Sequence, residues 1–215
     1  SGVKQILEIA SGFTASGLNI CKEDEKIKYV EFDLPQVIRK KKQILKSITT
    51  LPNNMFFVEG NALNYNDLEK TLKYFDLNKP IVVVNQGLLR YLDFNEKQIV
   101  TENIHKIISK KNGLWITCDF TPAKFIQSQN KNLSDNISKD YNKSLSNITD
   151  RNNINWRFKD KEEVERFLNK NNLTIEWHEF TESINMLSSK ARFALIDEQV
   201  LPYLENAYVG IIRLL

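Results

Sequence analysis

The 215-residue chain has little of what marks several common classes of protein. It has only two cysteines, Cys21 and Cys118, and neither belongs to a paired motif, so a disulfide framework is not expected and a reducing cytoplasm fits best. No run approaches the roughly 18 apolar residues that a membrane-spanning helix needs. No signal peptide is visible ahead of the first hydrophobic run. We therefore expect a cytoplasmic location and no membrane partner.

The excess of positive over negative charge is small, and histidines are few. A net charge of +3 is too small to indicate a nucleic-acid partner. The one dense basic run, residues 39–42, contains no aromatic residues that could stack on bases, so we interpret it as a solvated helix face rather than a phosphate-binding patch. His105 and His178 have no neighbours at metal-ligand spacing, and no metal site is expected.

Hydrolase and nucleotide-triphosphatase motifs are missing as well: neither G-x-S-x-G nor G-x-x-x-x-G-K occurs. The chain does contain ordinary amounts of hydrophobic (41%) and charged (27%) residues, and its length suits one domain over residues 1–215 with a substantial core.

Hydrophobic runs of strand length alternate with helical patterns, which is typical of βαβ units and a parallel sheet. Pro35 suits a first helical turn, Asp67 a helix cap, and Asn112-Gly113 a helix end. The expected strands are 4–10, 28–32, 55–58, 81–84, 114–119, 173–180 and 208–214. The expected helices are 14–21, 35–48, 66–75, 94–110, 160–171 and 197–203.

Residues 121–155 break this rhythm. They are mostly polar, and their apolar residues recur loosely at helical intervals. We interpret them as a mobile helical cap insertion that forms part of an acceptor site, and a disordered insertion is the alternative.

Three hydrophobic runs end in polar or acidic residues next to small ones, within residues 5–14, 29–35 and 81–87. In an open parallel sheet, ligands bind at the carboxyl ends of the strands. A carboxylate at the end of the second strand can accept both hydroxyls of a ribose, as in enzymes that use NAD or S-adenosylmethionine. We favour Asp33 over Glu31 for this role because Asp33 stands at the very end, and capping of the next helix is the alternative for either residue.

A dinucleotide fingerprint needs three glycines, whereas Ala10, Gly12 and Ala15 occupy those positions here. This weakens a nicotinamide-dependent reductase as an interpretation. A methyltransferase needs less, because its cofactor has no pyrophosphate to bind.

At this point a family resemblance emerges from E-I-A-S-G-F-T, then V-E-F-D-L-P-Q-V-I-R-K-K, then N-Q-G-L-L-R-Y-L, in this order. Over residues 4 to about 120 the chain resembles class I S-adenosylmethionine-dependent methyltransferases, and more narrowly the leucine carboxyl methyltransferase family and its bacterial O-methyltransferase relatives. The resemblance implies an α/β fold: a Rossmann-like three-layer sandwich with a mainly parallel seven-stranded sheet whose last strand is antiparallel.

The resemblance also implies positions for the cofactor, S-adenosyl-L-methionine. It places Ala10 and Gly12 at the methionine moiety, Asp33 at the ribose, and residues 61–63 at the adenine. The full set of expected cofactor-binding residues is Glu8, Ala10, Gly12, Asp33, Leu34, Asn61, Ala62, Leu63, Asn85 and Gln86.

The chain departs from the family pattern in this pocket. Ala10 replaces the usual first glycine, no acidic residue stands in residues 61–64, and Gln86 replaces the usual glutamate. The family also has an N-terminal helical segment that closes over the cofactor; the sequence begins almost at the first expected strand, so this segment is absent, trimmed or unobserved.

Methyl transfer is an in-line displacement that depends mainly on positioning, so no catalytic triad is expected. The candidates on the acceptor side are Asp119, Tyr91 and Arg90, with a helix cap and a packed aromatic as the plainer interpretations of Asp119 and Tyr91. The expected activity is O-methylation of a carboxylate or hydroxyl on a small molecule or peptide. The alternative is an inactive module of the same fold that binds cofactor or protein.

Overall fold

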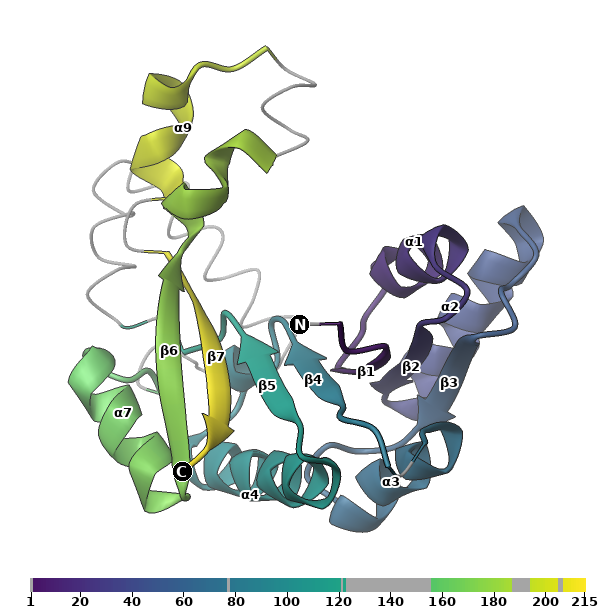
Figure 1. The fold of residues 1–215 in the computed structure, drawn as a ribbon, viewed down its shortest axis with the longest axis horizontal. Helices are drawn as coiled ribbons and strands as arrows, with labels where there is room; N and C mark the ends of the chain where they lie inside the picture. Colours follow the sequence, from purple (N-terminus) through teal and green to yellow (C-terminus); the bar gives the residue numbers. More distant parts are fainter. Residues whose placement is uncertain (1, 77, 121, 123–155, 187–193, 205–206) are drawn as a thin grey trace.

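The computed structural model describes residues 2–76, 78–120, 122, 156–186, 194–204 and 207–215 (Figure 1). Within these residues, seven strands form one sheet in the order β3-β2-β1-β4-β5-β7-β6. Neighbouring strands from β3 to β5 pair in parallel, whereas β7 is antiparallel to both of its neighbours. The strands are β1 (Gln5–Ile9), β2 (Lys28–Asp33), β3 (Met55–Glu59), β4 (Val82–Asn85), β5 (Leu114–Thr117), β6 (Leu173–Glu179) and β7 (Tyr208–Leu214).

Helices cover both faces of this sheet. On one face lie α3 (Tyr65–Glu69), η1 (Lys70–Tyr74), α4 (Phe94–Lys111) and α7 (Lys161–Lys170), whose apolar residues join the larger core cluster. On the other face, α1 (Ser16–Glu23) and α2 (Pro35–Ile48) pack over β1–β3 and form a second cluster around Leu18, Tyr29 and Leu45. The remaining described elements are η2 (Leu89–Tyr91), η4 (Phe180–Met186) and α9 (Asp197–Leu204), and the last two extend beyond the ends of β6 and β7 in Figure 1.

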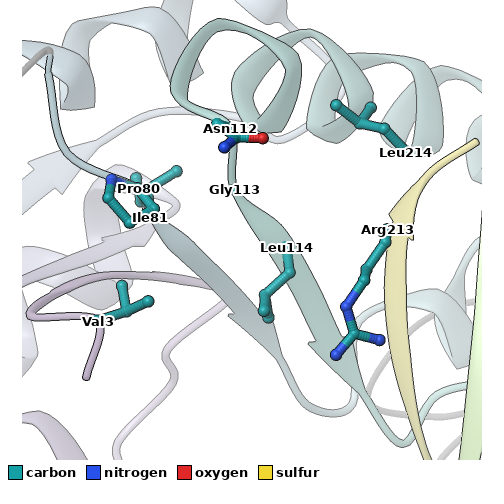
Figure 2. A pocket seen from close by; sticks show the side chains of 8 residues that line it. All are labelled: Val3, Pro80, Ile81, Asn112, Gly113, Leu114, Arg213 and Leu214. Atoms are coloured by element: carbon teal, nitrogen blue, oxygen red, sulfur yellow. The ribbon is translucent and has the colours of Figure 1, made fainter. Parts of the chain in front are cut away.

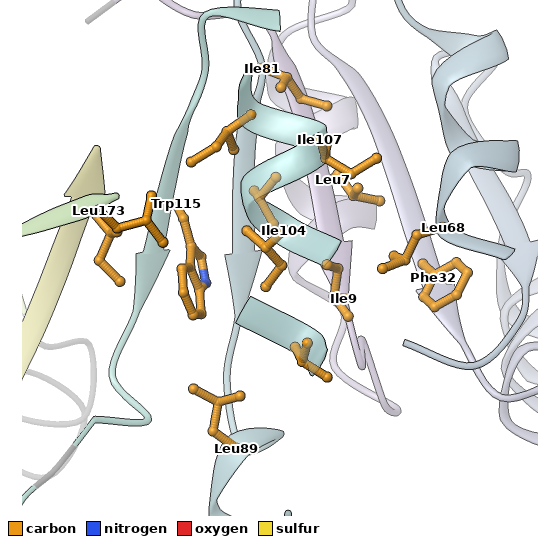
Figure 3. Packing of buried hydrophobic residues seen from close by; sticks show 14 of the residues in the cluster. Leu7, Ile9, Phe32, Leu68, Ile81, Leu89, Ile104, Ile107, Trp115 and Leu173 are labelled. Atoms are coloured by element: carbon orange, nitrogen blue, oxygen red, sulfur yellow. The ribbon is translucent and has the colours of Figure 1, made fainter. Parts of the chain in front are cut away.

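The larger core is centred on α4. Ile104 and Ile107 are fully buried and face Leu7 and Ile9 of β1, while Trp115 of β5 packs nearby (Figure 3). Burial of one such side chain contributes about 1.5–3 kcal/mol, so this layer fixes β1, β4 and β5 relative to one another. The carboxyl ends of these strands are thereby held rigidly.

Local signals account for the start and end of α4. Asp93 accepts a hydrogen bond from the Glu96 amide, and the Glu96 carboxylate accepts one from the Asp93 amide, which makes a capping box. Asn112 ends the helix in a left-handed conformation with φ 45°, and the Gly113 amide closes the last turn onto the Ile108 carbonyl.

The expected fold class is confirmed, and most expected boundaries differ from the observed ones by one or two residues. The third helix is the main exception, because it divides into the short α3 and the 3-10 helix η1. Its cap is Asn64, whose side chain accepts from the Asn66 amide, so the expectation of Asp67 as the cap was wrong. The expected cap insertion at 121–155 lies outside the described residues apart from Pro122.

Candidate functional site

The strand order places a topological switch point between the neighbouring strands β1 and β4. From β1 the chain continues outward to β2 and β3, and from β4 it continues in the opposite direction to β5. Ligands of open α/β sheets bind outside the carboxyl ends of the strands at such a point. Ile9 pairs with both Phe32 of β2 and Asn85 of β4, so the segments that follow β1, β2 and β4 share one edge. The expected cofactor-binding residues after these three strands are therefore brought together.

The turn after β1 has an unusual backbone. Ala10 has φ 57° and Gly12 has φ 50°, which is the left-handed region. The Ser11 amide donates to the Phe32 carbonyl at 3.3 Å, and the Gly12 amide donates to Asp33 Oδ2 at 2.8 Å. For a residue with a Cβ, this conformation costs about 1–2 kcal/mol. The replacement of the family's glycine by Ala10 therefore leaves a strained turn in place.

Asp33 is fixed at the end of β2 by backbone donors. Its Oδ2 accepts from the Gly12 amide at 2.8 Å and its Oδ1 accepts from the Leu34 amide at 2.7 Å. An ionised carboxylate offers about four acceptor positions, so roughly two remain for ribose hydroxyls. The side chain is oriented and still has capacity to bind a ligand.

The turn leaves room for a ligand. A Cβ built on Gly12 would meet no other atom within 4 Å. The Ser11 hydroxyl is buried and makes no hydrogen bond within the described residues, so a polar group in the turn still lacks a partner. These features fit a polar, nucleoside-containing cofactor.

A buried network of charged and polar groups lies under this turn. The Tyr29 hydroxyl donates to Glu8 at 3.0 Å, and Lys41 Nζ lies 2.6 Å from Glu31 Oε2. Burial raises the pKa of Glu31 to about 7, although Lys41 opposes this, and it raises the pKa of Glu8 above the usual range. Lys41 also donates to the Ser11 carbonyl at 3.2 Å, which connects the network to the turn.

The interpretation of residues 39–42 as a solvated helix face is wrong for Lys41, which is buried. Arg39 and Lys40 are exposed, but only 2% of Lys41 is accessible. The signal was available: Lys41 follows Ile38 by three positions and precedes Leu45 by four, and both of these are buried.

The loop after β3 is held by its own side chains and by α4. Asn61 Oδ1 accepts from the Leu63 amide, and the Asn61 amide donates to Asp67. The Ala62 carbonyl accepts from Asn103 Nδ2 at 2.9 Å. Ala62 and Leu63 are half-buried against the larger core, which gives the loop an apolar side where the resemblance places adenine.

Asp119 organises the loop after β4. Its carboxylate accepts from Asn85 Nδ2 at 2.7 Å and from the backbone amides of Gly87, Leu88 and Leu89 at 2.6, 2.6 and 2.8 Å. Asn85 in turn accepts from Trp115 Nε1 at 2.6 Å, so a continuous set of hydrogen bonds runs from the core to this loop. The Asp119 carboxylate is thus engaged by four donors.

The other candidates on this side lie on or next to the same loop. Gln86 and Arg90 are exposed, whereas Tyr91 is half-buried at the end of η2. The structure therefore brings Asp119, Asn85 and Gln86 together and leaves Arg90 accessible at the edge of the loop.

A cavity of about 270 Å³ lies elsewhere, near the amino ends of β4 and β5 (Figure 2). Its lining residues are Val3, Pro80, Ile81, Asn112, Gly113, Leu114, Arg213 and Leu214. Arg213 is paired with Glu176 at 2.8 Å, and none of the expected site residues reaches this cavity. We assign it no chemistry.

The described residues contain neither a metal-binding cluster nor a membrane-spanning helix. No group of three or more histidine, cysteine, aspartate or glutamate residues there could hold a metal ion. No helix there combines the length and the apolar character needed to span a bilayer.

Residues 1–105 match the model of the leucine carboxyl methyltransferase family, whose members use S-adenosyl-L-methionine. No curated protein sequence matches the chain significantly.

Solved structures resemble the whole chain. An O-methyltransferase family protein from Burkholderia thailandensis aligns with a TM-score of 0.59 and 14% identity, over 99% of this chain and 51% of that one. The mitomycin 7-O-methyltransferase MmcR aligns with a TM-score of 0.58 and 11% identity, over 100% of this chain and 50% of that one. A third structure is that of NcsB1, an O-methyltransferase of neocarzinostatin biosynthesis solved with S-adenosylmethionine and 2-hydroxy-5-methyl naphthoic acid. It aligns with a TM-score of 0.57 and 8% identity, over 99% of this chain and 49% of that one.

At these identities the likeness shows the fold, and the chain spans about half the length of each of these proteins.

Proposed function

Since the chain resembles leucine carboxyl methyltransferases over residues 1–105 and has the fold of S-adenosylmethionine-dependent O-methyltransferases, we propose that it binds S-adenosyl-L-methionine and transfers its methyl group to an oxygen. The acceptor is a carboxylate or hydroxyl on a small molecule or peptide. The bound cofactor supplies an electrophilic methyl group, and the protein supplies positioning.

The observation that carries the proposal is the contact between the turn after β1 and Asp33. The Gly12 amide donates to Asp33, and this places a left-handed, open turn next to a carboxylate that can still accept hydrogen bonds. The turn would accommodate the methionine portion of the cofactor, and Asp33, together with Leu34, the ribose. Ala62 and Leu63 would cover the adenine with apolar surface, and Asn61 would shape that loop.

On the acceptor side, the hydrogen bonds of Asp119 support a positioning role. With four donors on its carboxylate, Asp119 holds Asn85 and the backbone of residues 87–89 in place. Gln86 stands between these anchored residues, and this supports its proposed place at the cofactor. Tyr91 and Arg90 remain the side chains proposed to contact the acceptor. A carboxylate acceptor is already ionised at neutral pH and needs no general base.

A second candidate function is a module of the same fold that binds the cofactor without turnover. It is motivated by two departures from the pattern that the resemblance implies, Ala10 in place of a glycine and Gln86 in place of a glutamate. Both candidates predict cofactor binding, and they differ in whether any acceptor is methylated.

The test begins with thermal unfolding in the presence of S-adenosylhomocysteine, with NADH as the control. A ligand that binds only the folded state raises the midpoint, and at 100 times its dissociation constant it stabilises by about 2.7 kcal/mol. We expect a shift with S-adenosylhomocysteine and none of comparable size with NADH, and the reverse pattern would refute the cofactor assignment. A screen of carboxylate and hydroxyl acceptors for release of S-adenosylhomocysteine then separates the enzyme from the inactive module.

The cytoplasmic location, the single domain over residues 1–215 and the role of residues 121–155 as a cap over the acceptor site remain proposals. The cap follows directly after the segment that contains Asp119, at the ligand edge of the sheet. Loops at that edge are where specificity is most often determined.

A further inference from the structure

Lys41 and Glu31 form a buried ion pair, and Lys41 also contacts the turn after β1. Lys41 Nζ lies 2.6 Å from Glu31 Oε2, and the two side chains are 2% and 0% exposed. Taking two charges out of water is costly, and such a pair adds little net stability compared with apolar residues of the same volume. Stability alone therefore does not explain why an ion pair stands at this position.

Lys41 makes a second contact that gives the pair a specific task. The ammonium group donates to the Ser11 carbonyl at 3.2 Å, and Ser11 lies between the two left-handed residues Ala10 and Gly12. The Ser11 amide donates to the Phe32 carbonyl, and the Gly12 amide donates to Asp33. The Thr14 hydroxyl also donates to the Ser11 carbonyl, at 3.3 Å, so Lys41 supplies the one charged donor among these four hydrogen bonds of the turn.

Glu31 fixes where the ammonium group lies. A Cβ on Gly17 of α1 would fall 2.7 Å from Glu31 Oε1, so α1 packs directly against this carboxylate and leaves it little freedom. In the position where Lys41 Nζ lies 2.6 Å from Glu31, it also reaches the Ser11 carbonyl at 3.2 Å.

We propose that Lys41 and Glu31 are positioning residues that hold the turn of residues 10–12 in the conformation that binds S-adenosylmethionine. The inference rests on the proposed function and deepens it. Lys41 acts through the Ser11 carbonyl, and Glu31 acts through Lys41. Neither residue contacts the cofactor in this account.

The experiment compares four variants by calorimetric titration with S-adenosylhomocysteine and by urea unfolding. Lys41→Met removes the donor and leaves Glu31 buried without its partner. The double variant K41M/E31Q removes the donor and the buried charge together. Glu31→Gln alone keeps Lys41 and the Ser11 contact. Lys40→Met, on the exposed face of the same helix, is the matched control.

We expect Lys41→Met to lose both stability and affinity. In K41M/E31Q, stability should return toward that of the wild type because no unpaired charge remains. Affinity should stay roughly tenfold weaker because the Ser11 carbonyl has lost its charged donor and keeps only the Thr14 hydroxyl, at 3.3 Å. Glu31→Gln keeps a side-chain oxygen that can accept from the Lys41 ammonium group, so this conservative variant should bind within about threefold of the wild type, as should Lys40→Met. A purely structural pair would instead recover affinity and stability together.

Wild-type affinity in K41M/E31Q would overturn the proposal, and so would failure of this double variant to fold, since the pair would then be a folding element. Hydrogen exchange at the Gly12 amide provides a readout without ligand, and we expect faster exchange in K41M/E31Q than in Lys40→Met. If the wild type fails to bind S-adenosylhomocysteine, the proposed function falls, but the exchange result still decides whether the pair holds the turn.

Discussion

Replacing Ala10 by glycine should stabilise the protein. Ala10 has φ 57°, and this conformation costs a residue with a Cβ about 1–2 kcal/mol. Glycine removes that strain but gives the unfolded chain more freedom, at a cost of about 0.5–1 kcal/mol. The difference predicts a gain of about 0–1.5 kcal/mol with a midpoint of about 0.75 kcal/mol, and this midpoint corresponds to a rise in Tm of roughly 1.5–3 °C for a domain of this size.

Urea and thermal unfolding of Ala10→Gly measure this gain. The matched control is Ala62→Gly, because Ala62 does not have a positive φ and glycine there should destabilise by about 0.5–1 kcal/mol. Equal destabilisation by the two substitutions would show that the turn after β1 is not strained. Because the substitution keeps the observed turn, the affinity of Ala10→Gly for S-adenosylhomocysteine should be at least that of the wild type.

Three further predictions concern carboxylates near the site. Asp33→Ala should weaken S-adenosylhomocysteine binding by about 1–3 kcal/mol in a calorimetric titration, because ribose hydroxyls lose a charged partner; unchanged affinity would remove Asp33 from the site. Asp119→Asn should lower the free energy of unfolding by about 1–3 kcal/mol, because its amide nitrogen would face backbone amides that need an acceptor. An unchanged midpoint of urea unfolding would contradict this prediction. The pKa of Glu31 is about 7 in the folded protein against 4.5 ordinarily, so the folded state holds this proton more tightly and stability should fall by up to about 3 kcal/mol as pH rises from 4.5 to above 7. Unfolding midpoints across that range should fall less steeply in Glu31→Gln, and identical slopes would contradict the assignment.

The alternation of strands and helices and the location of Asp33 at the same sheet edge as the turn after β1 could be predicted because they follow from simple rules. Hydrophobic runs separated by helical patterns indicate βαβ units, and the carboxyl ends of parallel strands share an edge. The contact between Gly12 and Asp33 is a direct consequence of the pairing of β1 with β2. The reversed β7 was expected from the family resemblance alone, since periodicity carries no strand direction.

The contacts of Asp119 and Lys41 could not be predicted in the same way. Asp119 accepts from three successive amides only because residues 86–89 turn back over it, and no local pattern encodes that path. Lys41 stands in a run of basic residues that predicts exposure, and its burial follows from the helical register shared with Ile38 and Leu45. Charge pattern and helical period disagreed at this position, and the helical period was the better guide.

Hydrogen exchange of the wild type with and without S-adenosylhomocysteine tests the central claim most directly, because it locates the binding site as well as detecting binding. We expect added protection in segments that contain residues 10–15, 33–37 and 61–65, at the carboxyl edge of the sheet. Protection confined to residues 80–82 and 112–114, around the cavity at the opposite edge, or no change anywhere, would contradict the account.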